Sequence, residues 1–404
     1  MANNNKHTGP NVPALRFPEF SGEWEYKSLG EIGESLIGLT YSPSDVVKEG
    51  GTIVFRSSNI QDGVIDYGDL VRVSKKIKDS IITRDGDLLI CARNGSTRLI
   101  GKNALLKKSD EGQTFGAFMM VFRSIDNRFV HQLLSTKAYS TQVSENLGAR
   151  INQITTRNFA EYTFGMPQTS EEKEKIGTFL ELINDRIETQ SKIIEELTAL
   201  RSALHQGIMS TGLEDGSWRM QTLAEVLYER TELNNEGHAV HSVSVSKGIV
   251  NQIEYLGRSF AAKDTSRYHV AYPGDVIYTK SPTGEFPYGI VMQSQISIKA
   301  ALSPLYGVYV PISPEIGYII HNHFLSAKNA LNYLHPLIQK GAKNTINITN
   351  QRFLQNSMPL PINKNAALLY YNAIKTVSDK IILEEMVMEK FQSQKSFLLK
   401  TMFI

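Results

Sequence analysis

The chain repeats itself, and this repeat constrains its fold more than any other feature. Trp24 recurs as Trp218, 194 residues later (218 − 24). Gly86-Asp87 recurs as Gly274-Asp275 at a spacing of 188 (274 − 86), so the second copy is shorter by six residues (194 − 188) in its early part. Other matches keep the spacing of 194, namely Leu29 with Leu223, Ile154-Thr155 with Ile348-Thr349, Phe159 with Phe353, Pro167 with Pro361, and Asp185 with Asp379. A register held over whole domains indicates a duplicated unit, because solenoid repeats are far shorter. We therefore expect a pseudo-twofold molecule, suited to a two-part target or two identical partners.

The totals are those of an ordinary globular chain. Its 404 residues suffice for two to three domains, and 41% hydrophobic with 21% charged residues excludes a disordered protein. A net charge of +2 neither supports nor excludes nucleic-acid binding. The single Cys91 cannot form an intramolecular disulfide or a cysteine zinc site, and we expect it in the core. No apolar run is long enough to cross a bilayer and the start lacks a signal peptide, so we expect a cytoplasmic protein with a flexible tail over residues 1–22.

Each copy begins with a block of mixed secondary structure. Short β-rich runs such as Thr52–Phe55, Leu88–Cys91 and Phe118–Phe122 alternate with Asp-Gly and Asn-Gly turns. Single helical stretches are expected around Arg128–Leu147 and, in the second copy, near Ile316–Ile338. The expected fold class is therefore α+β, with similar domains over residues 23–167 and 218–361.

A long helix is predicted after each block, over residues 168–210 and 362–404, with a polar linker at 211–217. The apolar residues follow an alternating four-three spacing, which is the seam of a coiled coil. They are Ile176, Leu180, Ile183, Ile187, Ile194, Leu197, Leu204 and Ile208 in the first helix, and Tyr370, Ile374, Val377, Ile381, Met388, Phe391, Leu398 and Met402 in the second. The polar interruptions also match, since Gln190 and Arg201 recur as Glu384 and Lys395. A long helix with one apolar stripe needs a partner along its length, so we expect the two helices to pack antiparallel.

Catalytic and metal-binding motifs are not found. The chain lacks the glycine loop and the Asn/Asp-Pro-Pro-aromatic motif of a DNA methyltransferase, and Gly95–Asn103 has the wrong spacing for a P-loop. The pairs His238/His241 and His321/His323 have no cysteine or third ligand nearby, so no metal is expected. The Gly86-Asp87 and Gly274-Asp275 pairs suit a structural turn before a buried strand better than a nuclease carboxylate pair.

Polar and basic loops recur at equivalent places in both copies. Arg, Lys, Asn, Gln, Ser and Thr are the residue types that contact phosphates and base edges of DNA. The candidate DNA-binding residues are Arg93, Asn94, Ser96, Thr97, Arg98, Arg150, Asn152 and Gln153 in the first copy, and Lys280, Ser281, Thr283, Lys343, Asn344 and Asn347 in the second.

These features together resemble the specificity subunits of type I restriction–modification systems. The resemblance covers the whole chain and includes the opening Pro13–Phe20, the strands that start at Gly86 and Gly274, and the Ile-Thr-x-x-x-Phe segments ahead of a proline. It implies two target-recognition domains that each read half of a bipartite double-stranded DNA sequence, with the paired helices setting the gap. The family usually begins its helix with Pro-x-x-x-Glu-Gln. Here the second copy has Asn365-Ala366-Ala367 instead, so a weaker or different partner contact is expected there.

The resemblance also implies partners that carry the chemistry. Two modification subunits would dock on the helical region with S-adenosylmethionine, and restriction subunits would add ATP- and magnesium-dependent cleavage, so this chain itself holds no cofactor. Two alternatives remain open from the residues. One is a coiled-coil adaptor whose repeated domains bind proteins, and the other is a nuclease with an unrecognised site.

Overall fold

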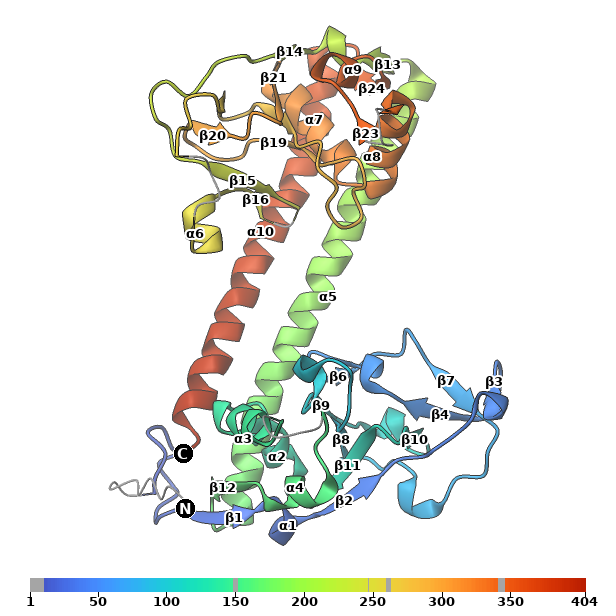
Figure 1. Cartoon of the computed structure of the whole chain (residues 1–404), viewed down its shortest axis with the longest axis vertical. Helices are drawn as coiled ribbons and strands as arrows, with labels where there is room; N and C mark the ends of the chain where they lie inside the picture. Colours follow the sequence, from blue (N-terminus) through green and yellow to red (C-terminus); the bar gives the residue numbers. More distant parts are fainter. Residues whose placement is uncertain (1–10, 148–151, 246, 259–262, 341–345) are drawn as a thin grey trace. The chain divides into compact units, whose positions relative to one another are not determined.

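A computed structural model describes the chain except for residues 1–10, 148–151, 246, 259–262 and 341–345. The chain divides into two compact units (Figure 1). Unit 1 comprises residues 1–192 and 386–404, and unit 2 comprises residues 193–385. Each unit thus contains one globular block together with a part of both long helices. The long helices are therefore not domains of their own.

The block of unit 1 is built on an antiparallel sheet with the strand order β2-β11-β8-β9. Its strands are β2 (Glu34–Ile37), β11 (Met119–Arg123), β8 (Leu88–Cys91) and β9 (Asn103–Leu105). A second sheet has the order β10-β4-β7-β3, made of β10 (Thr114–Phe115), β4 (Thr52–Phe55), β7 (Val71–Val73) and β3 (Val46–Val47). The smaller pairs are β1 (Glu25–Ser28) with β12 (Thr163–Met166) and β5 (Ile60–Gln61) with β6 (Val64–Ile65).

The block of unit 2 repeats the first sheet strand for strand, in the order β14-β21-β18-β19. These strands are β14 (Leu227–Glu229), β21 (Gly307–Pro311), β18 (Val276–Tyr278) and β19 (Val291–Gln293). The remaining pairs are β13 (Trp218–Thr222) with β24 (Ser357–Pro361), β15 (His241–Ser244) with β16 (Gly248–Asn251), β17 (His269–Ala271) with β20 (Ala300–Leu302), and β22 (Gln339–Lys340) with β23 (Ile346–Asn347). The predicted duplication and α+β class are confirmed by this shared topology. The pair β1-β12 also corresponds to the pair β13-β24 at the spacing of 194, whereas the remaining sheets differ between the copies.

Short helices cover the sheets. Those of unit 1 are α1 (Leu29–Ile32), α2 (Asn127–Leu133), α3 (Lys137–Leu147) and α4 (Thr156–Glu161); those of unit 2 are α6 (Gln252–Leu256), α7 (Pro314–Phe324), α8 (Ala327–Leu334) and α9 (Asn350–Phe353). The two single helices expected around residues 128–147 and 316–338 are therefore each broken into two. Ser326 supplies an internal cap at the second break, since its side chain accepts from Asn329 N.

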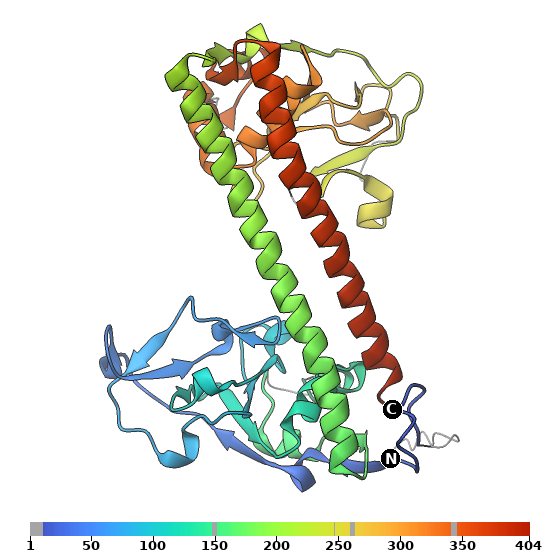
Figure 2. The same cartoon turned by 180° about the vertical axis from the view of Figure 1, so that it is seen from behind.

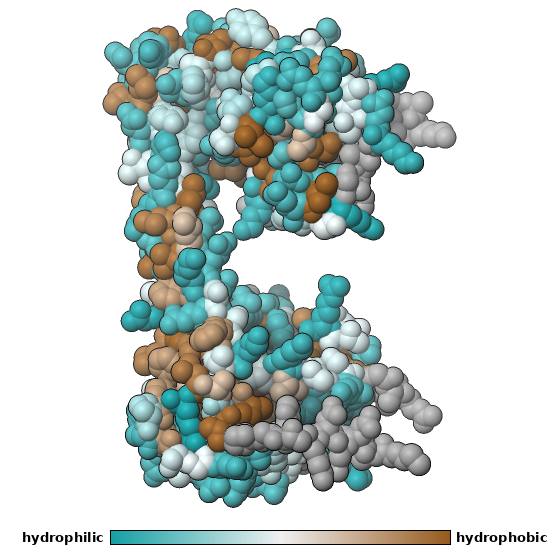
Figure 3. Space-filling view, turned by 90° about the vertical axis from the view of Figure 1, so that its left-hand side faces the viewer, coloured by the Kyte–Doolittle hydropathy of each residue, from teal (hydrophilic) through white to brown (hydrophobic). Residues whose placement is uncertain are grey.

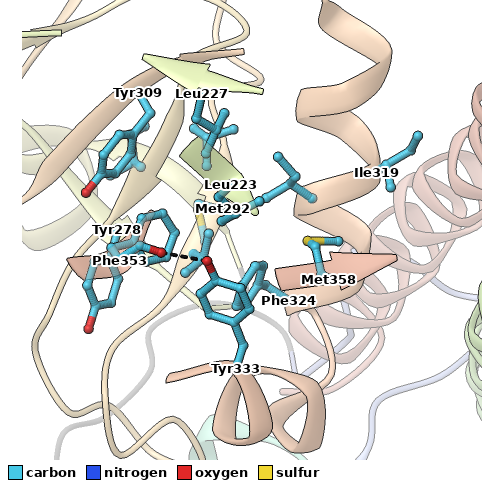
Figure 4. Close-up of a cluster of buried hydrophobic side chains, with 14 of the residues drawn as sticks. Leu223, Leu227, Tyr278, Met292, Tyr309, Ile319, Phe324, Tyr333, Phe353 and Met358 are labelled. Carbon is cyan, nitrogen blue, oxygen red and sulfur yellow. Dashed lines mark hydrogen bonds between the residues drawn. The ribbon is translucent and has the colours of Figure 1, made fainter. Parts of the chain in front are cut away.

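The repeated Ile-Thr-x-x-x-Phe segment is a helix start in both units. Thr155 and Thr349 are the N-caps of α4 and α9, and each side-chain oxygen accepts a backbone N–H three residues later. Phe159 and Phe353 are fully buried. In unit 2, Tyr278 stacks on Phe353 at 4.7 Å between ring centroids, and the Tyr333 hydroxyl donates to the Phe353 carbonyl at 2.6 Å (Figure 4). The repeat thus preserves a capped turn and the aromatic anchor of each core.

The Gly-Asp pairs are structural turns, as the sequence predicted. Gly86 and Gly274 have positive φ values of 79° and 87°, which favour glycine. Asp87 is buried and receives two hydrogen bonds from Arg123, at 2.8 and 2.7 Å. Asp275 is buried likewise and receives two from Arg230, at 2.7 and 3.1 Å. Arg123 is the last residue of β11, whereas Arg230 directly follows β14, so the two copies form the same ion pair from different positions.

The long helices are α5 (Ser170–Asp215) and α10 (Lys364–Thr401). In unit 1, the first half of α5 shares a core with the C-terminal end of α10, through Ile176, Leu180 and Leu398. In unit 2, Leu204 and Ile208 of α5 pack against a core that includes Ile374 from the first half of α10. Within each unit the two helices therefore run antiparallel, side by side (Figures 1 and 2). Every predicted seam residue is buried or half-buried.

Two expectations are wrong, one about the linker after the first long helix and one about the N-terminal segment. The helix α5 continues to Asp215, so most of the expected linker at 211–217 is helical; Gly212 fits inside the helix because the Trp218 ring packs directly against it. The expected flexible tail is wrong for residues 11–22, which are fastened to unit 1. Arg16 donates to Glu172 at 2.7 and 2.8 Å, and Leu15 N donates to Thr401 O at 2.9 Å. No helix in the described part of the chain has the length and apolarity to span a membrane.

Candidate nucleic-acid interface

The candidate loops of unit 1 lie next to each other. Arg93 follows the buried strand β8 and forms an antiparallel bridge with Gln153, while Ile154 N donates to Ala92 O at 2.8 Å. The loop that starts at Arg93 and the segment Asn152–Gln153 are therefore adjacent, although about 60 residues of sequence separate them. The sequence placed both segments in the candidate site without showing that they touch.

The side chains of the Arg93 loop play different parts. The side chain of Asn94 is hydrogen-bonded within the protein: its amide donates to Ser57 Oγ at 3.0 Å and its carbonyl oxygen accepts from Ser96 N at 2.9 Å. Ser96, Thr97 and Arg98 are exposed, the last two on a short 3-10 turn at Thr97–Leu99. Asn94 thus shapes the loop, and its neighbours present donors to solvent.

Phe118 belongs to this site and was not found from the sequence. Its ring is 59% exposed, and the Arg93 guanidinium lies 5.0 Å from the ring centroid. The Phe118 carbonyl accepts both Ala92 N and Arg93 N, at 3.0 and 2.9 Å, which fixes the backbone beneath the pair. The only sequence signal was an aromatic residue just before the buried strand β11, which reads equally well as part of that strand.

The corresponding loop of unit 2 follows β18. Lys280 adopts a left-handed conformation with φ +60°, and its Cα packs against Gly289. Burial of this half-buried ammonium lowers the pKa of Lys280, an effect that the nearby Glu229 partly offsets. Ser281 and Thr283 are exposed, and a backbone bridge between Thr283 and Phe286 closes the loop. This loop presents fewer cations than its counterpart in unit 1.

Several candidates have little or no described geometry. Arg150, Lys343 and Asn344 lie outside the described residues. Asn347 is described as part of β23, where it pairs with Gln339. Of the second candidate segment, the structure therefore describes Asn152 and Gln153 in unit 1 and Asn347 in unit 2.

The histidines and the cysteine occupy structural positions. His238 lies 3.2 Å from Glu236, and His321 Nδ1 accepts Gln293 N at 3.3 Å. Among the residues that the structure describes, no three His, Cys, Asp or Glu side chains are grouped to hold a metal ion. Cys91 is fully buried as expected, and burial raises the pKa of its thiol to about 11.

Fold and loops define a class of protein: a tandem pair of similar α+β blocks, each joined to paired antiparallel helices and each presenting a polar loop after the same strand of its sheet. Residues 21–199 match the family described as the type I restriction modification DNA specificity domain. The family model and two sequence relatives all indicate a type I restriction–modification specificity subunit.

Two relatives are similar in sequence. The type I restriction enzyme EcoKI specificity subunit of Escherichia coli (strain K12) is 26% identical over 286 residues, which cover 64% of this chain and 61% of that protein. The StySPI specificity subunit of Salmonella potsdam is 25% identical over 225 residues, or 51% and 48% of the two chains. The match therefore spans less than two thirds of the length of either relative.

A solved structure shares the fold. The S subunit of a type I restriction–modification system from M. genitalium superposes with a TM-score of 0.65, covering 97% of this chain and 99% of that one. Its sequence is 13% identical, so this likeness concerns the fold alone.

Proposed function

We propose that this chain is the non-catalytic DNA-recognition subunit of a type I restriction–modification complex. Each block reads one half of a bipartite double-stranded target, and the helices set the gap between the halves. One observation carries the proposal. The same four-stranded sheet occurs twice, and the loops after its equivalent strands β8 and β18 differ, with Arg93–Arg98 in one copy and Lys280–Thr283 in the other. Shared scaffolds with different loops suit two readers of two different half-sites.

The loop chemistry fits such a division of labour. Arginine and lysine neutralise phosphates and provide most of the salt-sensitive affinity, while Ser, Thr, Asn and Gln donate to or accept from base edges. Asn152, Gln153, Lys343, Asn344, Asn347 and Arg150 extend this candidate surface as proposals from the sequence. A half-site reader binds weakly alone, so two readers joined in one chain gain affinity and specificity through effective concentration.

The helices are proposed as the docking region for two modification subunits. Large apolar side chains outside the seam remain exposed on both helices, and such surface commonly marks a protein interface. They are Leu182, Ile193, Leu200 and Leu213 on α5 and Leu369, Ile382, Leu383, Met386 and Phe397 on α10. Figure 3 shows apolar surface gathered along the helices. The modification subunits would carry S-adenosylmethionine, and restriction subunits would carry ATP and magnesium.

A DNA-binding measurement tests this function. The complex with the modification subunits is titrated with the DNA sequence that genome-wide adenine methylation identifies, over a range of salt concentrations. Affinity is expected to fall steeply with salt and to favour that sequence over a scrambled one. Arg98→Ala should weaken binding and reduce the salt slope by about one unit.

A matched control is Arg157→Ala. Arg157 is exposed in the same unit, but its guanidinium is already paired with Glu161 on α4 at 3.0 Å, so its removal should weaken binding less than Arg98→Ala does. A complex that binds all sequences equally at every salt concentration would refute the recognition role. It would favour the protein-binding adaptor instead.

A further inference from the structure

Each block presents an exposed apolar side chain at the edge of its candidate DNA-binding loops. In unit 1 it is Phe118, which is 59% exposed, and in unit 2 it is Leu305, which is 67% exposed. Neither residue belongs to the hydrophobic cores that the described residues form. Burial within the fold therefore does not explain an apolar residue at either place.

The two side chains occupy the same position in equivalent turns. Gly116–Met119 is a four-residue turn closed by a backbone hydrogen bond of 2.8 Å from its last residue to its first, and Phe118 is its third residue. Ser303–Tyr306 is closed in the same way at 3.0 Å, and Leu305 is its third residue. The first turn leads into β11 and the second into β21, which are equivalent strands of the repeated sheet. The duplication has thus kept an apolar side chain in water at this turn.

Both turns lie beside the candidate loops. In unit 1, β11 pairs antiparallel with β8, so the turn before β11 and the loop after β8 are at the same end of the sheet (Figure 1). The Phe118 carbonyl accepts Arg93 N from that loop at 2.9 Å. In unit 2, β21 pairs antiparallel with β18. Leu305 therefore lies at the end of the sheet from which the Lys280 loop departs.

The neighbours of Phe118 indicate what its ring can contact on DNA. The exposed Arg93 guanidinium lies 5.0 Å from the ring centroid, and Ser96 and Thr97 are exposed in the same loop. In the major groove, thymine presents its C5-methyl group beside the O4 acceptor, and the other three bases carry no methyl group there. An apolar side chain set among hydrogen-bond donors matches this combination of groups.

Insertion between stacked bases suits these side chains less well. Residues that unstack DNA enter as wedges between base steps, whereas one face of the Phe118 ring already carries the Arg93 guanidinium. Leu305 has no ring to stack on a base. The contact that both residues can make is an apolar one at a base edge.

We propose that Phe118 and Leu305 each contact the C5-methyl group of a thymine in the half-site that its unit reads. The inference rests on the proposed function and deepens it, because it assigns one base to each half-site and names the side chain that recognises it. An aromatic and an aliphatic residue then perform the same task on two different half-sites.

Replacing thymidine by deoxyuridine tests the contact, because deoxyuridine lacks only the C5-methyl group. Each thymidine of the target identified by methylation mapping is replaced singly, and affinity for the complex with the modification subunits is measured. In each half-site, one replacement should weaken binding about fourfold, as expected for the loss of one buried methyl group. Phe118→Ser should abolish this effect in one half-site and leave it in the other. Leu305→Ser should do the reverse.

The far ends of the same strands supply matched controls. Ile125 is 94% exposed just beyond the opposite end of β11, and Ile312 is 53% exposed directly after β21. Ile125→Ser and Ile312→Ser should leave both deoxyuridine effects unchanged. Phe118→Leu keeps an apolar side chain and should retain the effect, which separates a methyl contact from a change in the shape of the loop.

The possible outcomes separate this inference from the proposed function. A complex that binds its sequence specifically but tolerates deoxyuridine at every position would overturn the methyl contact and leave the proposed function standing. The same holds if Phe118→Ser weakens the binding of thymidine and deoxyuridine DNA equally, because the side chain would then act by another route. A complex without any sequence preference would defeat both.

Discussion

The twin ion pairs give a sharp test of how each unit is stabilised. Arg230→Met should destabilise unit 2 and leave unit 1 unchanged, and Arg123→Met should do the reverse. Removing either arginine leaves a buried aspartate without its charge partner, Asp275 in unit 2 and Asp87 in unit 1, and both aspartate side chains are at most 3% exposed.

The expected magnitude follows from that burial. Breaking a buried pair by removing one partner costs about 3–5 kcal/mol, because an uncompensated charge stays behind. The arginine side chains are 17% and 20% exposed, so some solvent reaches each site and we expect about 3 kcal/mol. Arg230→Met also removes the cation–π contact with Tyr272, whose ring centroid lies 4.0 Å from the guanidinium carbon.

The chain supplies a separate reporter for each unit. It has two tryptophans, Trp24 buried in unit 1 and Trp218 buried in unit 2. With 5-fluorotryptophan, each gives its own ¹⁹F resonance, and a urea titration follows both at once. In Arg230→Met the native Trp218 resonance should vanish at lower urea, while the Trp24 resonance keeps its wild-type midpoint.

A compensating variant separates charge burial from lost packing. Adding Asp275→Asn to Arg230→Met removes the stranded charge but keeps an oxygen for Tyr272 N, which Asp275 accepts at 2.8 Å. Most of the lost stability should return. The reasoning fails if Arg230→Met shifts both resonances equally, or if the added Asn restores nothing.

Two further predictions concern acid and helix length. Burial, helped by the charge of Lys395, lowers the pKa of His131 to about 4, so the unfolded state binds the proton more readily. The contribution of neutral His131 to the stability of unit 1 is complete above pH 6.5 and is lost as the pH falls toward 4, by up to about 3 kcal/mol. In His131→Gln, the urea midpoint reported by Trp24 should therefore fall less steeply with decreasing pH. A pH profile equal to that of the wild type would refute this prediction. Inserting seven residues into each long helix lengthens it by about 10 Å, close to the length of three base pairs at about 3.4 Å each. Methylation mapping should then show a wider gap between the two half-sites, with the half-sites themselves unchanged. An unaltered gap would refute the spacing role of the helices.

Much of the fold could be predicted because it depends on local pattern. The run Leu88–Cys91 is apolar throughout and forms the fully buried strand β8. The four-three spacing of Ile176, Leu180 and Ile183 places them on one face of a helix, and all three are buried. The repeat then carried each assignment from one copy to the other.

The candidate site was predicted only in part. The loop after β8 was located by its composition, but its contact with Gln153 and the Arg93–Phe118 pair were not. These depend on how distant strands and segments come together. A residue type shows what a side chain can bind, and only its neighbours show whether it is free to do so, as Asn94 illustrates by bonding to Ser57.

By itself, the sequence determined the duplication, buried strands such as β8, the two long helices and their seams, because periodicity and capping act over a few residues at a time. The tertiary structure alone decided which arginine neutralises each aspartate: Pro311 stands where the first copy has Arg123 (311 − 188), and Arg230, just after β14, reaches Asp275 instead. It likewise decided that residues 11–22 are fastened to unit 1, through Arg16 with Glu172 and Leu15 with Thr401. Such contacts join residues far apart in the chain, and they form wherever burial leaves a charge or an apolar surface that needs a neighbour.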